Sequence, residues 1–157
     1  MTSKVLILRS CRLSQFLAAV VLARTRHPEA EIVALSHRGH RHVLRAAGAD
    51  TVIEVPGSRF GILSIPPWTL AEIRKTQYDE VIIPQMTDDT AAHINLYRVV
   101  LALKPTRVVI VPGDGRPRIY DRAAFMSLAL QHSYSGSGFS RAAMFVGAAY
   151  LARLTRG

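Results

Sequence analysis

The sequence predicts an α/β fold built on an open parallel sheet, and three observations lead to this prediction. Short segments rich in Val and Ile alternate with longer helix-like segments along the chain. The short segments are almost continuously apolar, which is typical of parallel strands that are covered by helices on both faces. Residues that end or cap helices stand between them, such as Gly48, Asp88 and Pro105.

The predicted strands are Lys4–Arg9, Glu31–Ser36, Thr51–Val55, Glu80–Pro84 and Arg107–Val111. The predicted helices between them are Leu13–Arg26, Arg38–Ala47, Trp68–Thr76 and Asp88–Leu103. Right-handed crossovers would join such strands into a Rossmann-like sheet of about five strands, with helices on both faces and the expected order 3-2-1-4-5. We expect this α/β domain to span residues 1–115 and a C-terminal helical tail to span 116–157.

Composition narrows the class of protein. A chain of 157 residues is long enough to bury one core, and an apolar content of 49% argues against disorder. Cys11 is the one cysteine, so there is no internal disulfide framework, as in proteins of a reducing compartment. The N-terminus enters a strand-like run directly, and the longest apolar stretch, Ala142–Ala152, is far shorter than the ~20 residues of a membrane span. We therefore expect a cytoplasmic protein.

The chain is strongly basic, with 20 Lys and Arg against 11 Asp and Glu. Such a charge suits nucleic acid or an anionic membrane surface, although arginine can also be a default surface residue. Residues 116–157 carry six of the arginines and one acid. Aromatic stacking platforms and a recognisable reading helix are missing, so nucleic acid is the least favoured partner.

Residues that follow the predicted strands are the candidate site residues, because ligands of open parallel sheets bind at the carboxyl ends of the strands. No glycine follows the first strand, which excludes a dinucleotide-binding turn. The segment HRGHRH (residues 37–42) offers histidines, but the arginines beside them favour a basic helix start over a metal site. We therefore predict no cofactor and no metal.

Two other segments leave alternatives open. Asp88 and Asp89 with His93 suit either acid–base chemistry or helix capping. The segment PGDGRPR (112–118) suits either an anion-binding nest or a plain turn.

Several of these segments resemble the opening of the family 9 glycosyltransferases, the heptosyltransferase type. KVLILR, the turn LSQ, the long Ala/Leu helix and HPEAEIVAL follow that family's order, and WTLAEIRKTQYDEVIIPQ is similar to its segment at the fourth strand. The likeness covers residues 4–111 and implies the N-terminal, acceptor-side half of a two-domain GT-B enzyme.

Departures from the family pattern imply a scaffold without catalysis. The family has Leu-Gly-Asp where this chain has Leu13-Ser14-Gln15, and glutamine cannot replace the aspartate that is thought to act as the base. Pro84 replaces a further aspartate, and residues 112–157 are too few for the donor-binding domain. We expect no catalytic residue, with Gln15 the degenerate position. The residual acceptor cleft would comprise Arg9, Ser10, Arg12, Ser14, Gln15 and Gln85.

The loop 56–68 and the tail form a predicted contact surface. An apolar loop of this length is often functional, although it can also fold back onto the core. Two tail helices are predicted, Tyr120–His132 and Ser140–Arg156, which pack on this domain, on a membrane or on a partner. The predicted contact residues are Phe60, Ile62, Leu63, Ile65, Arg116, Arg118, Arg141, Arg153 and Arg156.

The sequence thus leads to a functional hypothesis. A non-catalytic glycosyltransferase-like module would act as a peripheral accessory or bridging subunit of a membrane protein complex, at the inner face of the membrane. The alternative is the acceptor-binding half of a split glycosyltransferase that acts on a lipid-linked or cell-envelope glycan, with a separate donor-domain chain as its partner. An anionic membrane surface is a further expected contact.

Overall fold

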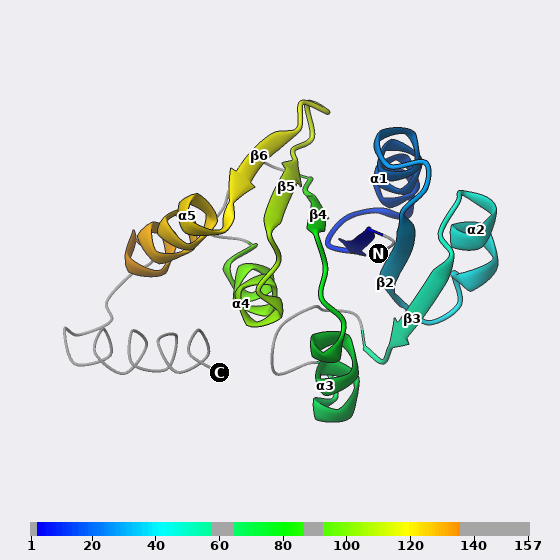
Figure 1. Ribbon diagram of the computed structural model, residues 1–157, viewed down its shortest axis with the longest axis horizontal. Helices are drawn as coiled ribbons and strands as arrows, with labels where there is room; N and C mark the ends of the chain where they lie inside the picture. The colour runs from blue at the N-terminus through cyan, green and yellow to red at the C-terminus, as the bar shows by residue number, and fades with distance from the viewer. Residues whose placement is uncertain (1–2, 58–64, 87–92, 136–157) are drawn as a thin grey trace.

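A computed structural model describes residues 3–57, 65–86 and 93–135 of the chain. Its centre is one six-stranded sheet with the order β3-β2-β1-β4-β5-β6 (Figure 1). The first five strands run parallel to one another, which confirms the predicted α/β class and the predicted order of those strands. The strands are β1 (Lys4–Leu8), β2 (Glu31–His37), β3 (Thr51–Val55), β4 (Glu80–Pro84), β5 (Arg107–Val111) and β6 (Arg118–Asp121).

Helices cover both faces of the sheet, and alternate residues of each strand therefore face different helices. In β1, Val5 and Ile7 lie in one buried cluster with Phe16 of α1, whereas Leu6 and Leu8 lie in a second cluster with residues of α3, α4 and α5. This explains the continuous apolar character of the strands, since neither face meets water. The helices are α1 (Leu13–Arg26), α2 (Arg41–Ala46), α3 (Pro67–Lys75), α4 (Ile94–Leu103) and α5 (Arg122–Ser135).

Local signals placed most boundaries correctly. Gly48 ends α2 as predicted: its φ is +110°, its N–H donates to the Arg45 carbonyl at 3.0 Å, and the Ala49 N–H donates to the Leu44 carbonyl at 3.0 Å. These two bonds form a Schellman motif, which glycine favours because it adopts positive φ without a Cβ clash. The predicted cap Asp88 lies outside the described residues.

The region after β5 differs from the prediction. Tyr120 and Asp121 were expected in a helix, but they end β6, which pairs antiparallel with β5. The Asp121 carboxylate then accepts the Ala124 N–H at 2.7 Å, and this N-terminal cap starts α5 at Arg122. The sheet thus extends past the predicted domain boundary at residue 115.

Helix α5 packs on this domain's own core. Phe125 and Ala129 are buried, and the Phe125 ring makes edge-to-face contacts with Tyr97 and Tyr120. The second predicted tail helix lies outside the described residues. Within residues 3–57, 65–86 and 93–135, no helix combines the length and the apolarity that crossing a membrane requires.

Candidate functional site

The strand order reverses between β1 and β4, so the carboxyl ends of these two strands form the topological switch point of the sheet. Ligands of open α/β sheets bind at this position. Ser10 bridges the two strands here, because its hydroxyl donates a hydrogen bond to the Pro84 carbonyl at the end of β4. Ser10 was predicted as a cleft residue, and its hydroxyl is used to hold the strand ends together.

Arg9, directly after β1, is the central charged group of this edge. Its Nη1 lies 2.8 Å from His40 Nδ1 and 3.5 Å from the Ser36 hydroxyl oxygen. Because a guanidinium can only donate, His40 must accept through Nδ1 and therefore carries its proton on Nε2. Burial, and after it the positive charge of Arg9, lowers the pKa of His37, which favours a neutral ring. The carboxyl ends of β1 and β2 therefore hold the fixed positive charge of Arg9 among neutral polar groups.

Gln15 lies in the first turn of α1, where the resemblance implied a lost base. Its Oε1 is buried and has no hydrogen-bond partner within the described residues, but an amide oxygen does not take up a proton at neutral pH. The neighbouring Cys11 is no nucleophile either, since burial raises the pKa of its thiol to about 11 despite the nearby Arg9. These groups can bind a ligand, but they supply neither a base nor an activated nucleophile.

Gln85 does not belong to an open cleft, contrary to the prediction. Its side chain is 2% exposed, and its Nε2 donates to the Tyr97 hydroxyl at 2.7 Å inside the core. Sequence reasoning missed Tyr97 as the partner, although its place on the apolar face of α4 could have indicated a buried ring. The remaining cleft residues Arg12 and Ser14 are exposed at the start of α1.

The predicted contact surface is also partly corrected. Ile65 is 3% exposed and packs in the core, so its assignment as a contact residue was wrong. Arg116 and Arg118 are exposed, as a contact role requires. The other predicted contact residues lie outside the described residues: Phe60, Ile62, Leu63, Arg141, Arg153 and Arg156.

Two exposed apolar side chains near this edge were not singled out as contact residues from the sequence. Trp68, at the start of α3, is 75% exposed, and Met86, just after β4, is 44% exposed. Met86 comes two residues after β4, and Trp68 lies in the first turn of α3, the helix that connects β3 to β4. Large exposed apolar side chains beside arginines are typical of surfaces that meet a membrane or a protein.

An open depression of about 340 Å³ lies between α2 and the end of β3, lined by Gly39, Arg41, His42, Arg45 and Glu54. Its one carboxylate, Glu54, already accepts the Gly39 N–H at 3.0 Å and pairs with Arg41 at 3.1 Å. Within the described ranges, no group of three His, Cys, Asp or Glu side chains is arranged to hold a metal.

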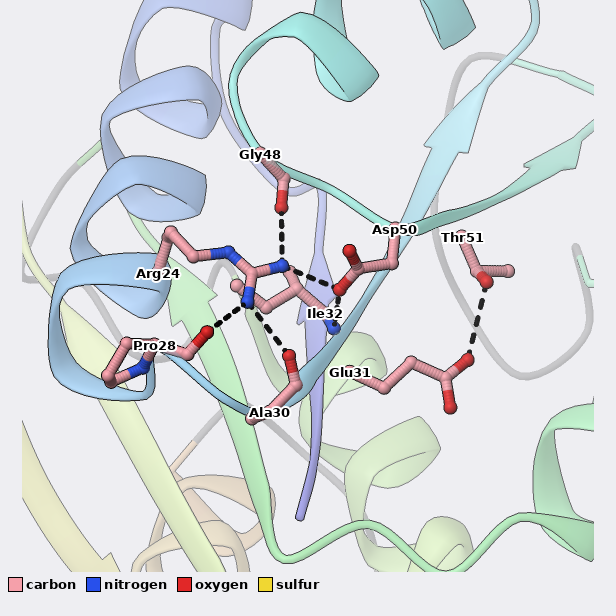
Figure 2. Close-up of polar contacts among 8 residues, drawn as sticks. All are labelled: Arg24, Pro28, Ala30, Glu31, Ile32, Gly48, Asp50 and Thr51. Atoms are coloured by element: carbon pink, nitrogen blue, oxygen red, sulfur yellow. Dashed lines mark hydrogen bonds and ion pairs between the residues drawn. The ribbon is translucent and has the colours of Figure 1, made fainter. Parts of the chain in front are cut away.

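The opposite, amino edge of the sheet shows what a purely structural arginine looks like (Figure 2). Arg24 of α1 donates to the carbonyls of Pro28, Ala30 and Gly48 at 2.9, 2.9 and 3.0 Å, and to Asp50 at 2.6 Å. Its guanidinium therefore ties α1 to the loops that precede β2 and β3. Nothing in this arrangement is left for a ligand.

No protein-family model, no curated protein and no solved structure matches this chain. The resemblance to the family 9 glycosyltransferases therefore remains a prediction from the quoted motifs, and the open, mostly parallel α/β sheet is what the structure itself establishes.

Proposed function

We propose that this chain is a non-catalytic, glycosyltransferase-like module that serves as a peripheral accessory or bridging subunit of a membrane-associated protein complex, at the inner face of the membrane. One observation carries the proposal: the carboxyl edge combines many arginines, few carboxylates and the exposed Trp68. Within the described residues, the charged groups of this edge are Arg9, Arg12, Arg38, Arg41, Arg116 and Arg118 against Glu54 and Asp114.

Such an edge suits the headgroup region of an anionic bilayer. Each Lys or Arg near an anionic leaflet contributes about 1 kcal/mol of attraction, and salt weakens it. A tryptophan ring is most stable at the boundary between headgroups and acyl chains, where its apolar body is covered and its N–H stays wet. Trp68 supplies the apolar anchor, and the arginines supply the attraction.

The proposal that this module is non-catalytic rests on Gln15 and Cys11. The amide of Gln15 cannot act as the base that acceptor activation requires, and the thiol of Cys11 stays protonated at neutral pH. The alternative is an acceptor-binding half of a split glycosyltransferase. It is favoured by the buried Oε1 of Gln15, which has no partner in the part of the chain that the structure describes and which a ligand hydroxyl could satisfy. A sugar-transfer assay with a separate donor-domain chain distinguishes the two, since only the split enzyme gives product.

Sedimentation with vesicles tests the docking edge. We expect the protein to sediment with phosphatidylglycerol-containing vesicles at low salt and to stay in the supernatant with pure phosphatidylcholine. The triple variant Arg12→Gln, Arg38→Gln, Trp68→Ser removes three exposed groups of the carboxyl edge and should lose most of this binding. The matched control Arg74→Gln, Lys75→Gln removes two exposed cations from the far end of α3 and should keep it. Equal binding by both variants would overturn the proposal.

A further inference from the structure

Arg9 is a half-buried arginine that has no carboxylate partner in the described part of the chain. Among the described residues, no Asp or Glu oxygen lies within 4.0 Å of its guanidinium, and its Nε is buried without a hydrogen-bond partner. Arg24 of the opposite edge, in contrast, donates four hydrogen bonds. A cation removed from water is normally paired, so an orphaned one indicates a group that the protein acquires from outside.

Two contacts fix the guanidinium of Arg9 through a single nitrogen. His40 and Ser36 contact Nη1, which leaves the fork formed by Nε–H and Nη2 without any partner in the described part of the chain. Two parallel N–H groups of this kind match two oxygens of a phosphate or carboxylate. A lysine could not offer the same geometry.

The surroundings also favour an anion. Glu54, the carboxylate at the end of β3, is already engaged by the Gly39 N–H and by Arg41. The contacts of Nη1 place the guanidinium of Arg9 next to Ser36 of β2 and His40, and its positive charge also acts on Cys11 in the turn before α1. The same turn presents Arg12 to solvent, and the next one presents Arg38. The carboxyl ends of β1 and β2 are therefore positively charged, and they belong to the edge where α/β sheets bind ligands.

We propose that Arg9 binds a phosphoryl oxyanion through its Nε–H and Nη2 groups, at the carboxyl ends of β1 and β2. The oxyanion belongs either to a free phosphate or phosphate monoester, or to a lipid headgroup. The site goes beyond the accessory role proposed above, because a soluble phosphate would bind here without any membrane.

Nuclear magnetic resonance of the arginine Nε–H groups tests the proposal directly. The ¹⁵N-labelled protein is titrated with inorganic phosphate at constant ionic strength, with chloride as the balancing anion. We expect a saturable shift of the Arg9 Nε–H signal that chloride does not cause. Arg9→Met should weaken phosphate binding, followed through backbone amides of the Ser10–Gln15 turn, by about tenfold or more. Arg98→Met removes an exposed arginine of α4 and should bind as the wild type does.

Arg9→Lys keeps the charge and loses the fork, so it should also bind more weakly than the wild type. An Arg9 signal that phosphate leaves unmoved in the folded wild type overturns the proposal, whatever the variants do. Equal weakening by Arg9→Met and Arg98→Met overturns it as well, since that result indicates general charge screening.

The two sources of the oxyanion are separated by their probes. Methyl phosphate in solution represents a monoester, and phosphatidic acid vesicles represent a headgroup; preference for either supports the site and identifies its source. Vesicle binding through Trp68 and Arg12 does not depend on the result of the phosphate titration. Likewise, the result of the titration does not depend on whether the protein binds vesicles. The site and the accessory role therefore fail independently.

Discussion

The two edges of the sheet treat the same kind of residue in opposite ways. At the amino edge, Arg24 is surrounded by three carbonyls and the Asp50 carboxylate (Figure 2). At the carboxyl edge, Arg9 meets only His40 and Ser36 and keeps a buried, unpartnered Nε within the described residues. Polar groups that are fully satisfied by the fold contribute stability, whereas unsatisfied ones are what a ligand can use.

Other charged groups of the amino edge follow the pattern of Arg24. Glu80, at the start of β4, is only 2% exposed. Its Oε2 lies 3.4 Å from Arg26 Nη2 and 3.5 Å from Arg107 Nη1, and its Oε1 lies 3.2 Å from His27 Nε2. Asp79 accepts the Lys4 N–H at 2.8 Å and the Ser3 hydroxyl at 2.9 Å. The amino edge is thus cross-linked by charges, and the comparison predicts that substitutions there change stability most.

Replacing Arg24 by methionine should cause the largest loss. The change removes four hydrogen bonds: three carbonyls lose this donor, and the Asp50 carboxylate keeps the Ile32 N–H but loses its cation. Because hydrogen bonds to charged groups each contribute about 1.5–3 kcal/mol and the site is partly wet, we expect a loss of about 3 kcal/mol in the free energy of unfolding. Urea denaturation measures it, with Arg98→Met as an exposed control. An unchanged midpoint would remove the distinction between the two edges.

Replacing Glu80 by glutamine should cause the second largest effect, a loss of about 2 kcal/mol in the free energy of unfolding. The amide keeps the shape of the side chain but leaves Arg26, His27 and Arg107 close together without a negative charge. The loss is smaller than for Arg24 because these cations are partly exposed and can turn toward water. Glu29→Gln, on an exposed residue, is the control; if it destabilises as much, the effect is one of net charge.

Acid should lower the stability of the protein through two carboxylates of the amino edge, Asp79 and Asp50. Hydrogen bonds from Lys4 N–H and the Ser3 hydroxyl lower the pKa of Asp79; at Asp50, burial acts to raise the pKa, but the Ile32 N–H and Arg24 outweigh it. Both pKa values lie below those of the unfolded chain, so this stability is complete above the unfolded pKa of about 4 and is lost as the pH falls through the folded values.

The test is a series of urea midpoints from neutral pH down into this acid range. Asp79→Asn should be less stable than the wild type at neutral pH and should lose less stability in acid. An equally steep acid loss in the variant would assign the effect to other carboxylates.

The smallest expected effect concerns the carboxyl edge and uses the single cysteine as a reporter. The Arg9 charge partly offsets the burial that raises the pKa of Cys11, so Arg9→Met should raise that pKa further and slow alkylation by iodoacetamide severalfold in mildly alkaline buffer. The overall stability should change little, because Arg9 has few partners to lose. An Arg12→Gln control should react like the wild type. Faster alkylation in Arg9→Met would show that Arg9 shields the thiol.

Local sequence patterns determined most of the fold. The apolar runs of β1, β3, β4 and β5 and the long Ala/Leu segment of α1 already carry the strand and helix propensities that the structure realises. Gly48 ended α2 because glycine adopts the positive φ that this helix end requires. Such features depend on neighbours in sequence, and the sequence therefore determined them alone.

Only the tertiary structure decided the features that depend on distant partners. Tyr120 entered a strand because β5 offered hydrogen bonds that the helix pattern of the tail could not reveal. Gln85 was buried because Tyr97 provided a hydroxyl, and Ile65 was buried because the core had room for it. Arg9 and Arg24 are the same residue type in the sequence, and the acceptors that the fold brings to each make one structural and leave the other open to a ligand.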